Sequence, residues 1–325
     1  PLGGTAWHPK NGDYYYGLFW EGMPDLNYTY PPVKAEMFNI VKFWLDKGVD
    51  GYRLDAIKYL VEDGALLENT PQTYALLEEF HDVYKTENPE AFTVGEVWSG
   101  TQSIIPYVQH DRLDVCFEFG LAGAILDAVN NGNPANLENQ LETVQNSYPM
   151  LQYATFLTNH DMDRVFSTLG GSTEKMKLAA SIYLTLPGIP FVYYGEEIGM
   201  TGTGDDLNKR RPMQWTDGSN AGFSSTTPWQ SIGGNFQTNN VLEMDADPAS
   251  ILRRYKKLIR IRNEQEALRK GQTLLLDNNS AAVFSFARIH QNEAVLVVSN
   301  TGTVTLNPAL TLSLSALPAG NYFIT

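Results

Sequence analysis

The sequence predicts an α/β protein, in which a parallel sheet with flanking helices is followed by a small antiparallel β-domain. Short apolar runs alternate with amphipathic helical patterns over most of the chain, which is typical of βαβ units. After residue 270 the helical pattern ends, and short strands separated by turn residues such as Asp277-Asn278-Asn279 follow. The chain has 325 residues, of which 43% are hydrophobic, so it is long enough for two globular domains.

The repeating pattern begins with a helix from Pro31 to Gly48, since proline favours the first turn of a helix and glycine its end. Further helices are expected over residues 73–85, 121–146, 174–185 and 249–262. Strands are expected over residues 49–54, 92–94, 113–119, 153–157 and 189–194. A (β/α)₈ barrel needs eight strands. With five expected strands, this pattern is compatible both with an incomplete barrel and with a doubly wound sheet.

Both ends of the chain depart from this pattern. Residues 1–30 are rich in aromatic residues and glycine, show no helical period, and are expected to be the tail of an irregular inserted loop. No signal-peptide pattern follows Pro1, so we expect the natural N-terminus, and any signal peptide with it, to be missing. The β-pattern also stops at Thr325 as though cut.

The overall charge and the single cysteine exclude several classes of function. A net charge of -14 argues against binding to nucleic acid or to an anionic membrane surface. Cys116 is the one cysteine, so an intramolecular disulfide and a thiolate metal cluster are excluded. No stretch is long and apolar enough to be expected to span a bilayer.

Three acidic residues stand just after predicted strands. Asp55 follows Gly51-Tyr52-Arg53-Leu54, Glu96 follows the strand that begins at Phe92, and Asp161 follows the strand that begins at Tyr153. In an α/β barrel the carboxyl ends of the strands share one face, which carries the active site. The three carboxylates are therefore expected to converge.

Converging carboxylates suit the hydrolysis of glycosidic bonds. A retaining enzyme needs an ionised carboxylate nucleophile and a carboxylic acid about 5–5.5 Å away. Arg53 lies two residues before Asp55, on the same side of the strand, and a neighbouring guanidinium favours an ionised carboxylate. Trp98 could supply the less polar wall that a protonated Glu96 needs, and His160 could donate a hydrogen bond to a sugar hydroxyl.

Each of these residues also has a purely structural interpretation. Asp55 could cap a helix that begins at Ala56, and Glu96 could be a surface residue in a turn. Asn159-His160-Asp161 could form a capping turn or part of a metal ligand set, and Arg53 could be a structural ion-pair partner. The same placement after three strands favours the functional interpretation.

These segments resemble the signature regions of glycoside hydrolase family 13, the α-amylase family. Gly51-Tyr52-Arg53-Leu54-Asp55-Ala56 resembles the second region, Gly95-Glu96-Val97-Trp98 the third, and Thr158-Asn159-His160-Asp161 the fourth. Met23-Pro24-Asp25-Leu26-Asn27 resembles the fifth region, in a form between the oligo-1,6-glucosidase and neopullulanase types. Arg211-Pro212-Met213-Gln214-Trp215, in a long loop that also carries Arg210, is similar to oligo-1,6-glucosidases and trehalose synthases.

The resemblance implies a role for each matching residue. Asp55 would be the nucleophile, Glu96 the general acid/base and Asp161 the carboxylate that stabilises the transition state. The substrate would be bound by the following residues: Arg53, His160, Asn159, Lys58, Trp98 and Arg164. The family usually has histidine after the lysine, where this chain has Tyr59.

The resemblance also implies the architecture. Residues 1–30 would be the tail of an inserted domain, and residues 31–266 strands four to eight of a (β/α)₈ barrel. Residues 267–325 would form an antiparallel β-sandwich domain. The first three barrel strands would be absent, so we expect the chain to be inactive or unstable unless another chain supplies them.

The expected function is that of a retaining α-glucoside hydrolase that cleaves α-1,4 bonds of starch or maltooligosaccharides. The alternatives are a trehalose synthase or transglycosylase acting on maltose, and a non-catalytic carbohydrate-binding relative or inactive fragment. A nucleotide-binding protein is disfavoured because no glycine-rich phosphate loop follows a strand. The chemistry would need no cofactor; the family often holds a calcium ion, but no ligand set is visible in the sequence. Secretion fits the family, although the sequence does not fix the compartment.

Overall fold

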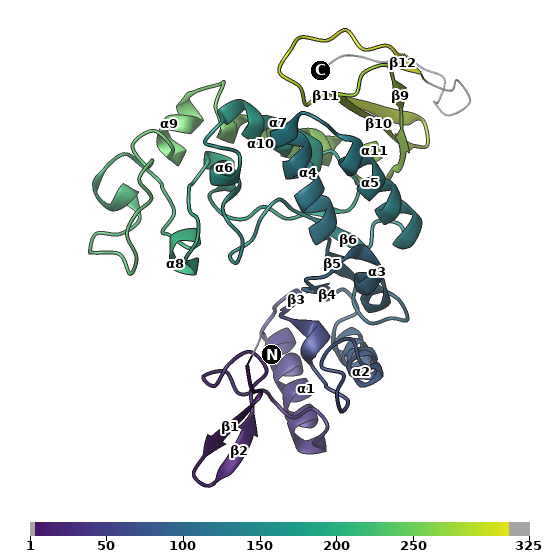
Figure 1. Cartoon of the computed structure of the whole chain (residues 1–325), viewed down its shortest axis with the longest axis vertical. Coiled ribbons are helices and arrows are strands. Elements are labelled where there is room, and N and C mark those ends of the chain that lie inside the picture. The colour runs from purple at the N-terminus through teal and green to yellow at the C-terminus, as the bar shows by residue number, and fades with distance from the viewer. Residues whose placement is uncertain (1–3, 312–325) are drawn as a thin grey trace. The chain divides into compact units, whose positions relative to one another are not determined.

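The computed structural model describes residues 4–311, which fall into two compact units (Figure 1). The first unit contains the described residues up to Val97 together with Gln109–Asp114. The second unit contains Trp98–Val108 and the described residues from Val115 onward. Across the described residues, no helix combines the length and apolar character that a bilayer span requires.

The first unit is built from a hairpin, two helices, a 3₁₀ turn and two parallel strands. Its elements are β1 (Trp7–Lys10), β2 (Asp13–Tyr16), α1 (Pro31–Asp46), β3 (Gly51–Leu54), η1 (Ile57–Tyr59), α2 (Pro71–Glu87) and β4 (Phe92–Gly95). β3 and β4 pair in parallel, from Gly51 opposite Phe92 to Leu54 opposite Gly95. A Cβ atom on Gly51 would lie 1.8 Å from the carbonyl oxygen of Phe92, so only glycine permits this close approach.

The N-terminal hairpin corrects one sequence-based expectation. Residues 1–30 were expected to be irregular, but β1 and β2 form an antiparallel pair from Trp7 opposite Tyr16 to Lys10 opposite Asp13. Asn11 and Gly12 connect the strands with positive φ angles of 55° and 84°. An Asn-Gly pair with positive φ at both residues matches the twist of a two-residue hairpin. The strand after the turn, Asp13-Tyr14-Tyr15-Tyr16, has no alternation of polar and apolar residues, so its periodicity does not mark it as a strand.

A partly buried polar network centred on Asp114 joins helix α2 to strand β4. The carboxylate of Asp114 accepts hydrogen bonds from the backbone N–H of Thr93 at 2.8 Å and from the hydroxyl of Tyr84 at 3.0 Å. The ammonium of Lys85 lies 3.0 Å from the other oxygen of the same carboxylate. Tyr84 is fully buried and its ring packs beside Phe80. The same side chain therefore contributes apolar packing while its hydroxyl keeps a hydrogen-bond partner.

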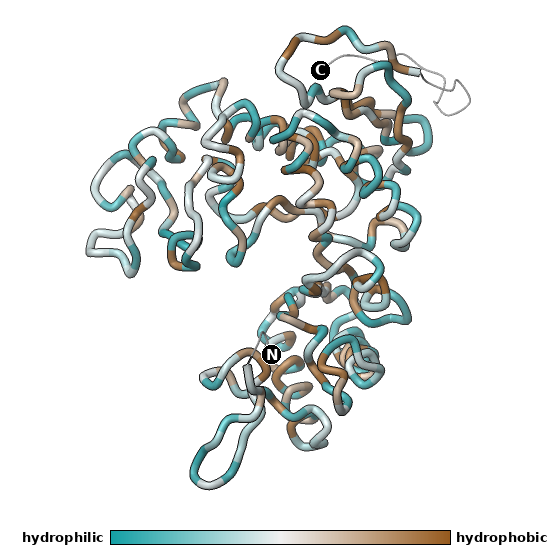
Figure 2. The backbone as a smooth tube through the Cα atoms, viewed as in Figure 1, coloured by the Kyte–Doolittle hydropathy of each residue, from teal (hydrophilic) through white to brown (hydrophobic). Residues whose placement is uncertain are grey.

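The second unit carries three more parallel strands, with helices before, between and after them. The strands are β5 (Val115–Phe117), β6 (Tyr153–Thr155) and β7 (Ile189–Pro190), which pair in that order. The helices are α3 (Thr101–Ile104), η2 (Ile105–Val108), α4 (Phe119–Asn131), α5 (Ala135–Ser147), α6 (Val165–Thr168), α7 (Thr173–Tyr183), η3 (Glu196–Ile198), α8 (Asp206–Lys209), η4 (Ser219–Gly222), α9 (Val241–Ala246), α10 (Ile251–Glu264) and α11 (Glu266–Lys270). The polar loops that carry α8 and α9 are mostly pale or teal in Figure 2.

Two antiparallel sheets follow the last helix. β10 (Val283–His290) lies between β8 (Gln272–Leu275) and β11 (Glu293–Asn300), and β9 (Asp277–Asn278) pairs with β12 (Leu310–Thr311). The turn expected at residues 277–279 was therefore wrong in part, since Asp277 and Asn278 are strand residues with a distant partner. The expected β-sandwich domain extends to residue 325, and its residues 312–325 lie outside the described part of the chain.

Two buried arginines fasten the C-terminal sheet and helix α10 to the segment before β7. Arg288 of β10 donates to the carbonyl oxygen of Thr185 at 3.0 Å. Arg262 of α10 donates to the carbonyl oxygens of Leu184 and Leu186 at 3.0 and 2.8 Å. Burial lowers the pKa of Arg262 to about 10.

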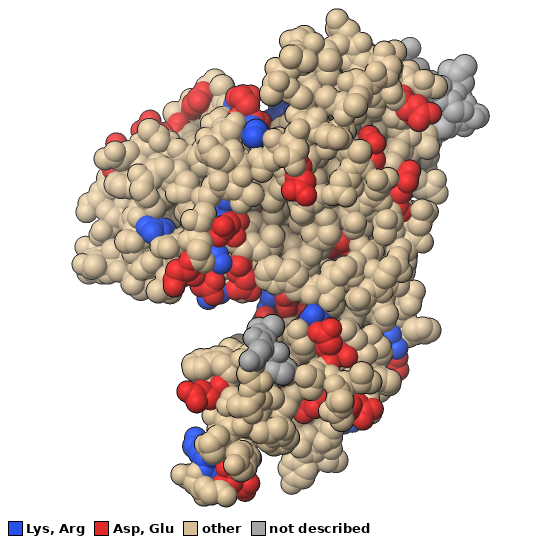
Figure 3. All heavy atoms as spheres, in the orientation of Figure 1, with Lys and Arg blue, Asp and Glu red and all other residues tan. Residues whose placement is uncertain are grey.

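The observed elements confirm the expected fold class. Five parallel strands alternate with helices as in an incomplete (β/α)₈ barrel, and antiparallel sheets of the sandwich type follow. Four of the five parallel strands are shorter than expected, and β4 extends one residue further, to Gly95. The largest difference is at β7, which ends at Pro190, whereas the sequence pattern continues to Tyr194. The domain boundaries after residues 30 and 266 stay predictions. Acidic and basic side chains are interspersed on the face that Figure 3 shows.

Candidate active site

Strand β3 presents Arg53 and ends just before Asp55. A guanidinium nitrogen of Arg53 forms a short ion pair with a carboxylate oxygen of Asp55. The predicted placement of the two side chains on one side of the strand is confirmed. The Asp55 side chain is 75% exposed, so one face of its carboxylate is open to a ligand.

Glu96, at the end of β4, is held in a different environment. Its residue is 8% exposed, and a carboxylate oxygen accepts the backbone N–H of Ala56 at 2.7 Å. Ala56 has a left-handed backbone with φ 45°, which is uncommon for a residue with a Cβ. The N-cap position of η1 is occupied by Ala56, so the interpretation of Asp55 as the cap of a helix that begins at Ala56 is wrong. Strain of this kind is often found at functional sites.

Lys58 lies in the same unit, with an acidic partner. Its ammonium is 2.9 Å from a carboxylate oxygen of Glu68 and 4.8 Å from the centre of the Tyr59 ring. Burial lowers the pKa of Lys58, but hydrogen bonds with Glu68 and Tyr59 outweigh this effect and raise it above its ordinary value. The hydrogen bond from Lys58 lowers the pKa of Glu68. The sequence did not single out Glu68.

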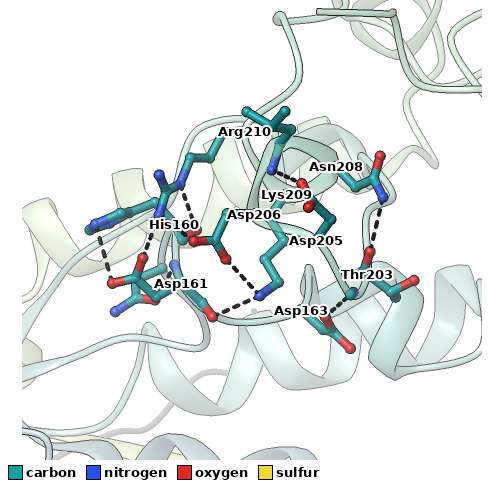
Figure 4. Close-up of polar contacts among 12 residues, drawn as sticks. His160, Asp161, Asp163, Thr203, Asp205, Asp206, Asn208, Lys209 and Arg210 are labelled. Atoms are coloured by element: carbon teal, nitrogen blue, oxygen red, sulfur yellow. Dashed lines mark hydrogen bonds and ion pairs between the residues drawn. The ribbon is translucent and has the colours of Figure 1, made fainter. Parts of the chain in front are cut away.

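In the second unit, Asp161 is the centre of a polar cluster (Figure 4). The guanidinium of Arg210 lies 2.6 Å from one oxygen of its carboxylate, and Nε2 of His160 lies 3.3 Å from the other. The side-chain oxygen of Asn159 accepts the backbone N–H of Asp161 at 2.9 Å. The predicted group of Asn159, His160 and Asp161 is thus held together by local hydrogen bonds, and Arg210 is added to it.

The short helix α8 ties the long loop to this cluster. Lys209 donates to the carbonyl oxygen of Asp161 at 3.0 Å, and Nε of Arg210 donates to the carbonyl oxygen of His160 at 3.1 Å. Asp206 accepts from both basic residues, at 3.2 and 3.1 Å, and the hydrogen bond from Lys209 lowers its pKa. The sequence indicates that Arg210 lies in a long loop of the kind that often carries function, but it does not indicate that Asp161 is its ion-pair partner. The available signal was Asp205, which caps α8, followed by basic residues one turn later.

Arg164 lies three residues after Asp161 and is buried, with 1% of its surface exposed. Its guanidinium lies 4.7 Å from the ring centres of both Tyr193 and Tyr194 and donates to the carbonyl oxygen of Tyr194 at 2.7 Å. Burial lowers the pKa of this guanidinium. A substrate contact was expected at Arg164, but a side chain enclosed in this way is suited to holding the backbone that follows Asp161.

Trp98 begins the second unit and stacks on Phe119. The ring centres are 4.9 Å apart with an angle of 13° between the planes, and 48% of Trp98 remains exposed. Its expected contact with substrate stays a prediction. Within residues 4–311, no group of three or more His, Cys, Asp or Glu side chains is arranged to hold a metal ion.

The fold and the site define a class of α/β proteins, in which parallel strands alternate with helices and functional carboxylates lie just beyond the ends of the strands. A family model described as "Alpha amylase, catalytic domain" matches residues 2–271. An α-amylase from Dictyoglomus thermophilum is 37% identical over 302 residues, and the match covers 91% of this chain and 58% of that protein. The chain therefore belongs to the α-amylase family of glycoside hydrolases.

Further comparisons agree with this family. An oligo-1,6-glucosidase from Parageobacillus thermoglucosidasius is 29% identical over 365 residues, covering 91% of this chain and 65% of the relative. The crystal structure of an α-amylase from H. orenii superimposes with a TM-score of 0.81 at 34% identity, covering 91% of this chain and 60% of the other. The chain thus spans less than two thirds of the length of each of these relatives.

Proposed function

We propose that this chain carries the catalytic residues of a retaining α-glucoside hydrolase, which cleaves α-1,4 bonds of starch or maltooligosaccharides by double displacement. The observation that carries the proposal is the contrast between two carboxylates at the ends of neighbouring parallel strands. Asp55 is exposed and paired with Arg53, whereas Glu96 is buried and accepts an N–H group from the backbone beside Asp55. Two carboxyl groups in different environments are suited to two different roles.

The proposed reaction has two steps. Glu96 donates its proton to the glycosidic oxygen while an oxygen of Asp55 attacks the anomeric carbon, so the leaving sugar departs and a glycosyl ester forms. Glu96, now ionised, takes a proton from water, and the water oxygen attacks the anomeric carbon and releases Asp55. Asp161, fixed by Arg210 and His160, is proposed to bind sugar hydroxyls as the ring distorts.

The preference for α-1,4 bonds rests on the similarity to the α-amylase from Dictyoglomus thermophilum. The similarity to an oligo-1,6-glucosidase favours α-1,6 bonds as a second candidate. Both reactions use the same carboxylates, and neither needs a cofactor. We assign any bound calcium ion a structural role only.

We further propose that additional polypeptide, supplied by a longer form of this protein or by another chain, covers one side of the first unit. Among the described strands, β3 pairs only with β4, although a (β/α)₈ barrel closes with eight strands. Helix α1 leaves Ile40, Phe43 and Trp44 exposed at helical spacing. A mostly apolar cavity of about 240 Å³ lies between α1, α2 and β3. These features together fit the packing face of a further strand and helix.

A panel of substrates tests the proposed specificity. The chain and an N-terminally extended form are incubated with maltotetraose, isomaltose and maltose, and the products are separated by anion-exchange chromatography. Cleavage of maltotetraose supports the α-1,4 assignment, and exclusive cleavage of isomaltose would replace it with α-1,6. Formation of trehalose from maltose would identify an isomerase. If only the extended form is active, the proposed need for additional polypeptide is supported as well.

A further inference from the structure

The buried guanidinium of Arg164 uses only part of its capacity to donate hydrogen bonds. Its Nη1 donates to the carbonyl oxygen of Tyr194. Its Nε and Nη2 have no hydrogen-bond partner among residues 4–311, and bulk solvent does not reach them because the side chain is buried. An N–H group of a charged side chain is costly to leave unpaired in the interior, so these two nitrogens call for a partner.

Two carboxyl groups that follow β7 are unpaired in the same region. Glu196 and Glu197 belong to η3, and one oxygen of Glu196 accepts the hydrogen bonds of Tyr183 and Tyr255. Oε2 of Glu196 and Oε2 of Glu197 are buried, and neither has a partner in the described part of the chain. Burial raises the pKa of both carboxyl groups, and attraction to Arg164 opposes this rise. The unpaired donors and acceptors are therefore close enough to influence each other.

Water is the molecule that suits the space between these groups. A Cβ atom on Gly195 would lie 3.2 Å from Nη1 of Arg164, so the backbone just before the two glutamates runs beside the guanidinium. A bound cation would be repelled by the guanidinium, and a bound anion by a carboxylate. A neutral water molecule accepts from N–H groups and donates to carboxyl oxygens, and buried water commonly pairs with groups left over in this way.

Arg164 is placed to pass this constraint on to Asp161, which lies three residues before it. The guanidinium lies against the rings of Tyr193 and Tyr194. The hydroxyl of Tyr193 donates to the carbonyl oxygen of Lys209 at 3.2 Å. The ammonium of Lys209 donates in turn to the carbonyl oxygen of Asp161 at 3.0 Å (Figure 4). Arg164 therefore contacts the segment of Asp161 along the chain and through the tyrosines.

We propose that buried water bridges Arg164 to Glu196 and Glu197, and that the two glutamates act through Arg164 as positioning residues for Asp161. The bridge fixes the guanidinium on the side that Tyr194 leaves free. The guanidinium then holds the backbone between Asp161 and α6. The catalytic consequence rests on the proposed function, in which Asp161 binds sugar hydroxyls as the ring distorts.

Replacing Glu197 tests the bridge without relying on turnover. Glu197→Leu removes the acceptor at similar volume, whereas Glu197→Gln keeps an oxygen that accepts from water. Hydrogen–deuterium exchange of the peptide over residues 158–164 is measured by mass spectrometry in an N-terminally extended form. We expect exchange to be several-fold faster in Glu197→Leu than in the parent, with Glu197→Gln in between. Glu243→Gln, at an exposed site of the same unit, is the matched control and should leave the exchange unchanged.

Kinetics separate positioning from general structural support. A purely structural Glu197 would lower the urea midpoint and leave the kcat of the folded enzyme unchanged. As a positioning residue, Glu197→Leu should lower kcat on maltotetraose roughly tenfold with KM little changed, because a small displacement of Asp161 is costly in the transition state. Glu197→Gln should restore most of this loss.

A high-resolution crystal structure of the extended parent keeps the inference testable even if Glu197→Leu misfolds. It should show water within hydrogen-bond distance of Nε or Nη2 of Arg164 and of an oxygen of Glu196 or Glu197. A direct ion pair between Arg164 and either carboxylate would overturn the inference, as would unchanged exchange in a folded Glu197→Leu variant. If no form turns over maltotetraose, the proposed function fails, while the exchange rates and the bridging water still decide this inference.

Discussion

The guanidinium of Arg210 lies 2.6 Å from the carboxylate of Asp161, although the two residues are 49 positions apart in the sequence. A second contact, from Arg210 to the carbonyl oxygen of His160, fixes the backbone of the same segment. The loop after residue 200 therefore controls the orientation of a carboxylate that we propose to act on the substrate. Both contacts come from Arg210, the C-cap residue of helix α8, so the integrity of this short helix bears on catalysis.

Replacing Arg210 should damage catalysis more than stability. Arg210→Ala is expected to lower kcat/KM on maltotetraose roughly 10–100-fold, because a small displacement of a positioned group is costly. The free energy of unfolding should fall by less than about 1 kcal/mol, since the Arg210–Asp161 pair is partly exposed. Steady-state kinetics and urea titration measure the two effects. Arg211→Ala is the control, because Arg211 donates to Asn208, Ser231 and Ile232 and not to Asp161. Equal losses in both variants would argue against this positioning role.

Lys58 and Glu68 should act as a unit in substrate binding. Because their side chains form an ion pair at 2.9 Å, Lys58→Met and Glu68→Gln are each expected to raise KM for maltotetraose roughly threefold, with kcat little changed. The double variant should be no worse than either single variant. Additive increases would show that the two residues contribute independently. The stabilisation from the pair is complete between the ordinary pKa values of Glu68 and Lys58. It is lost as the pH falls through the lowered pKa of Glu68 or rises through the raised pKa of Lys58, so kinetics at neutral pH are appropriate.

Arg164 should behave as a structural residue rather than as a substrate contact. Arg164→Ala is expected to lower the free energy of unfolding by roughly 2–4 kcal/mol, because it removes a large buried side chain and leaves a cavity. Arg164→Lys keeps the charge but loses the planar group between Tyr193 and Tyr194, and should lose part of this stability. Urea denaturation measures both. A raised KM with unchanged stability would instead support the contact expected from the sequence.

A buried carboxyl group gives the second unit a specific pH dependence. Glu196 is 3% exposed and accepts hydrogen bonds from Tyr183 at 3.0 Å and from Tyr255 at 2.6 Å. Burial raises the pKa of Glu196 to about 8, against an ordinary value of 4.5, because the neighbouring tyrosines offset only part of the cost of a buried charge. The folded protein therefore keeps a proton on Glu196 over a range in which the unfolded chain has lost it.

The sign of the effect follows from this difference. The stability that the proton confers is fully present below pH 4.5 and is lost as the pH rises toward 8. Within this range Glu196 contributes a fall on the order of 1 kcal/mol in the free energy of unfolding per pH unit. Glu196→Gln should remove this contribution, and Glu174→Gln, at an exposed site, should not. Urea titrations at pH 5, 6, 7 and 8 measure it. Identical pH profiles for the parent and Glu196→Gln would contradict the assignment.

The fold class was predictable because the signals for it are local. Apolar runs bounded by proline and glycine mark the strands and helices: Pro71 starts α2 one residue after its cap, and Gly132 ends α4 in a left-handed conformation. The limits of the strands were not predictable from such patterns. β7 ends at Pro190 because its pairing with β6 ends there, and pairing is a tertiary property. The strand at Asp277 depends likewise on a partner more than 30 residues away.

The candidate site was predictable in so far as its residues are adjacent in the sequence. Arg53 and Asp55 lie two residues apart and form the expected pair. The contacts of Glu96 with Ala56, and of Asp161 with Arg210, join segments about 40 and 50 residues apart, and no sequence period encodes them. The enclosure of Arg164 was not predictable, because the two tyrosines that surround its guanidinium follow a later strand; its expected contact with substrate stays a prediction.

The most direct test of the account is the anomeric form of the first product of maltotetraose hydrolysis, followed by proton NMR in an N-terminally extended form of the protein. The parent should release the α-anomer first, as double displacement through Asp55 requires, and Asp55→Asn should abolish turnover. Initial release of the β-anomer, or undiminished turnover by Asp55→Asn, would contradict the assignment of Asp55 as the nucleophile.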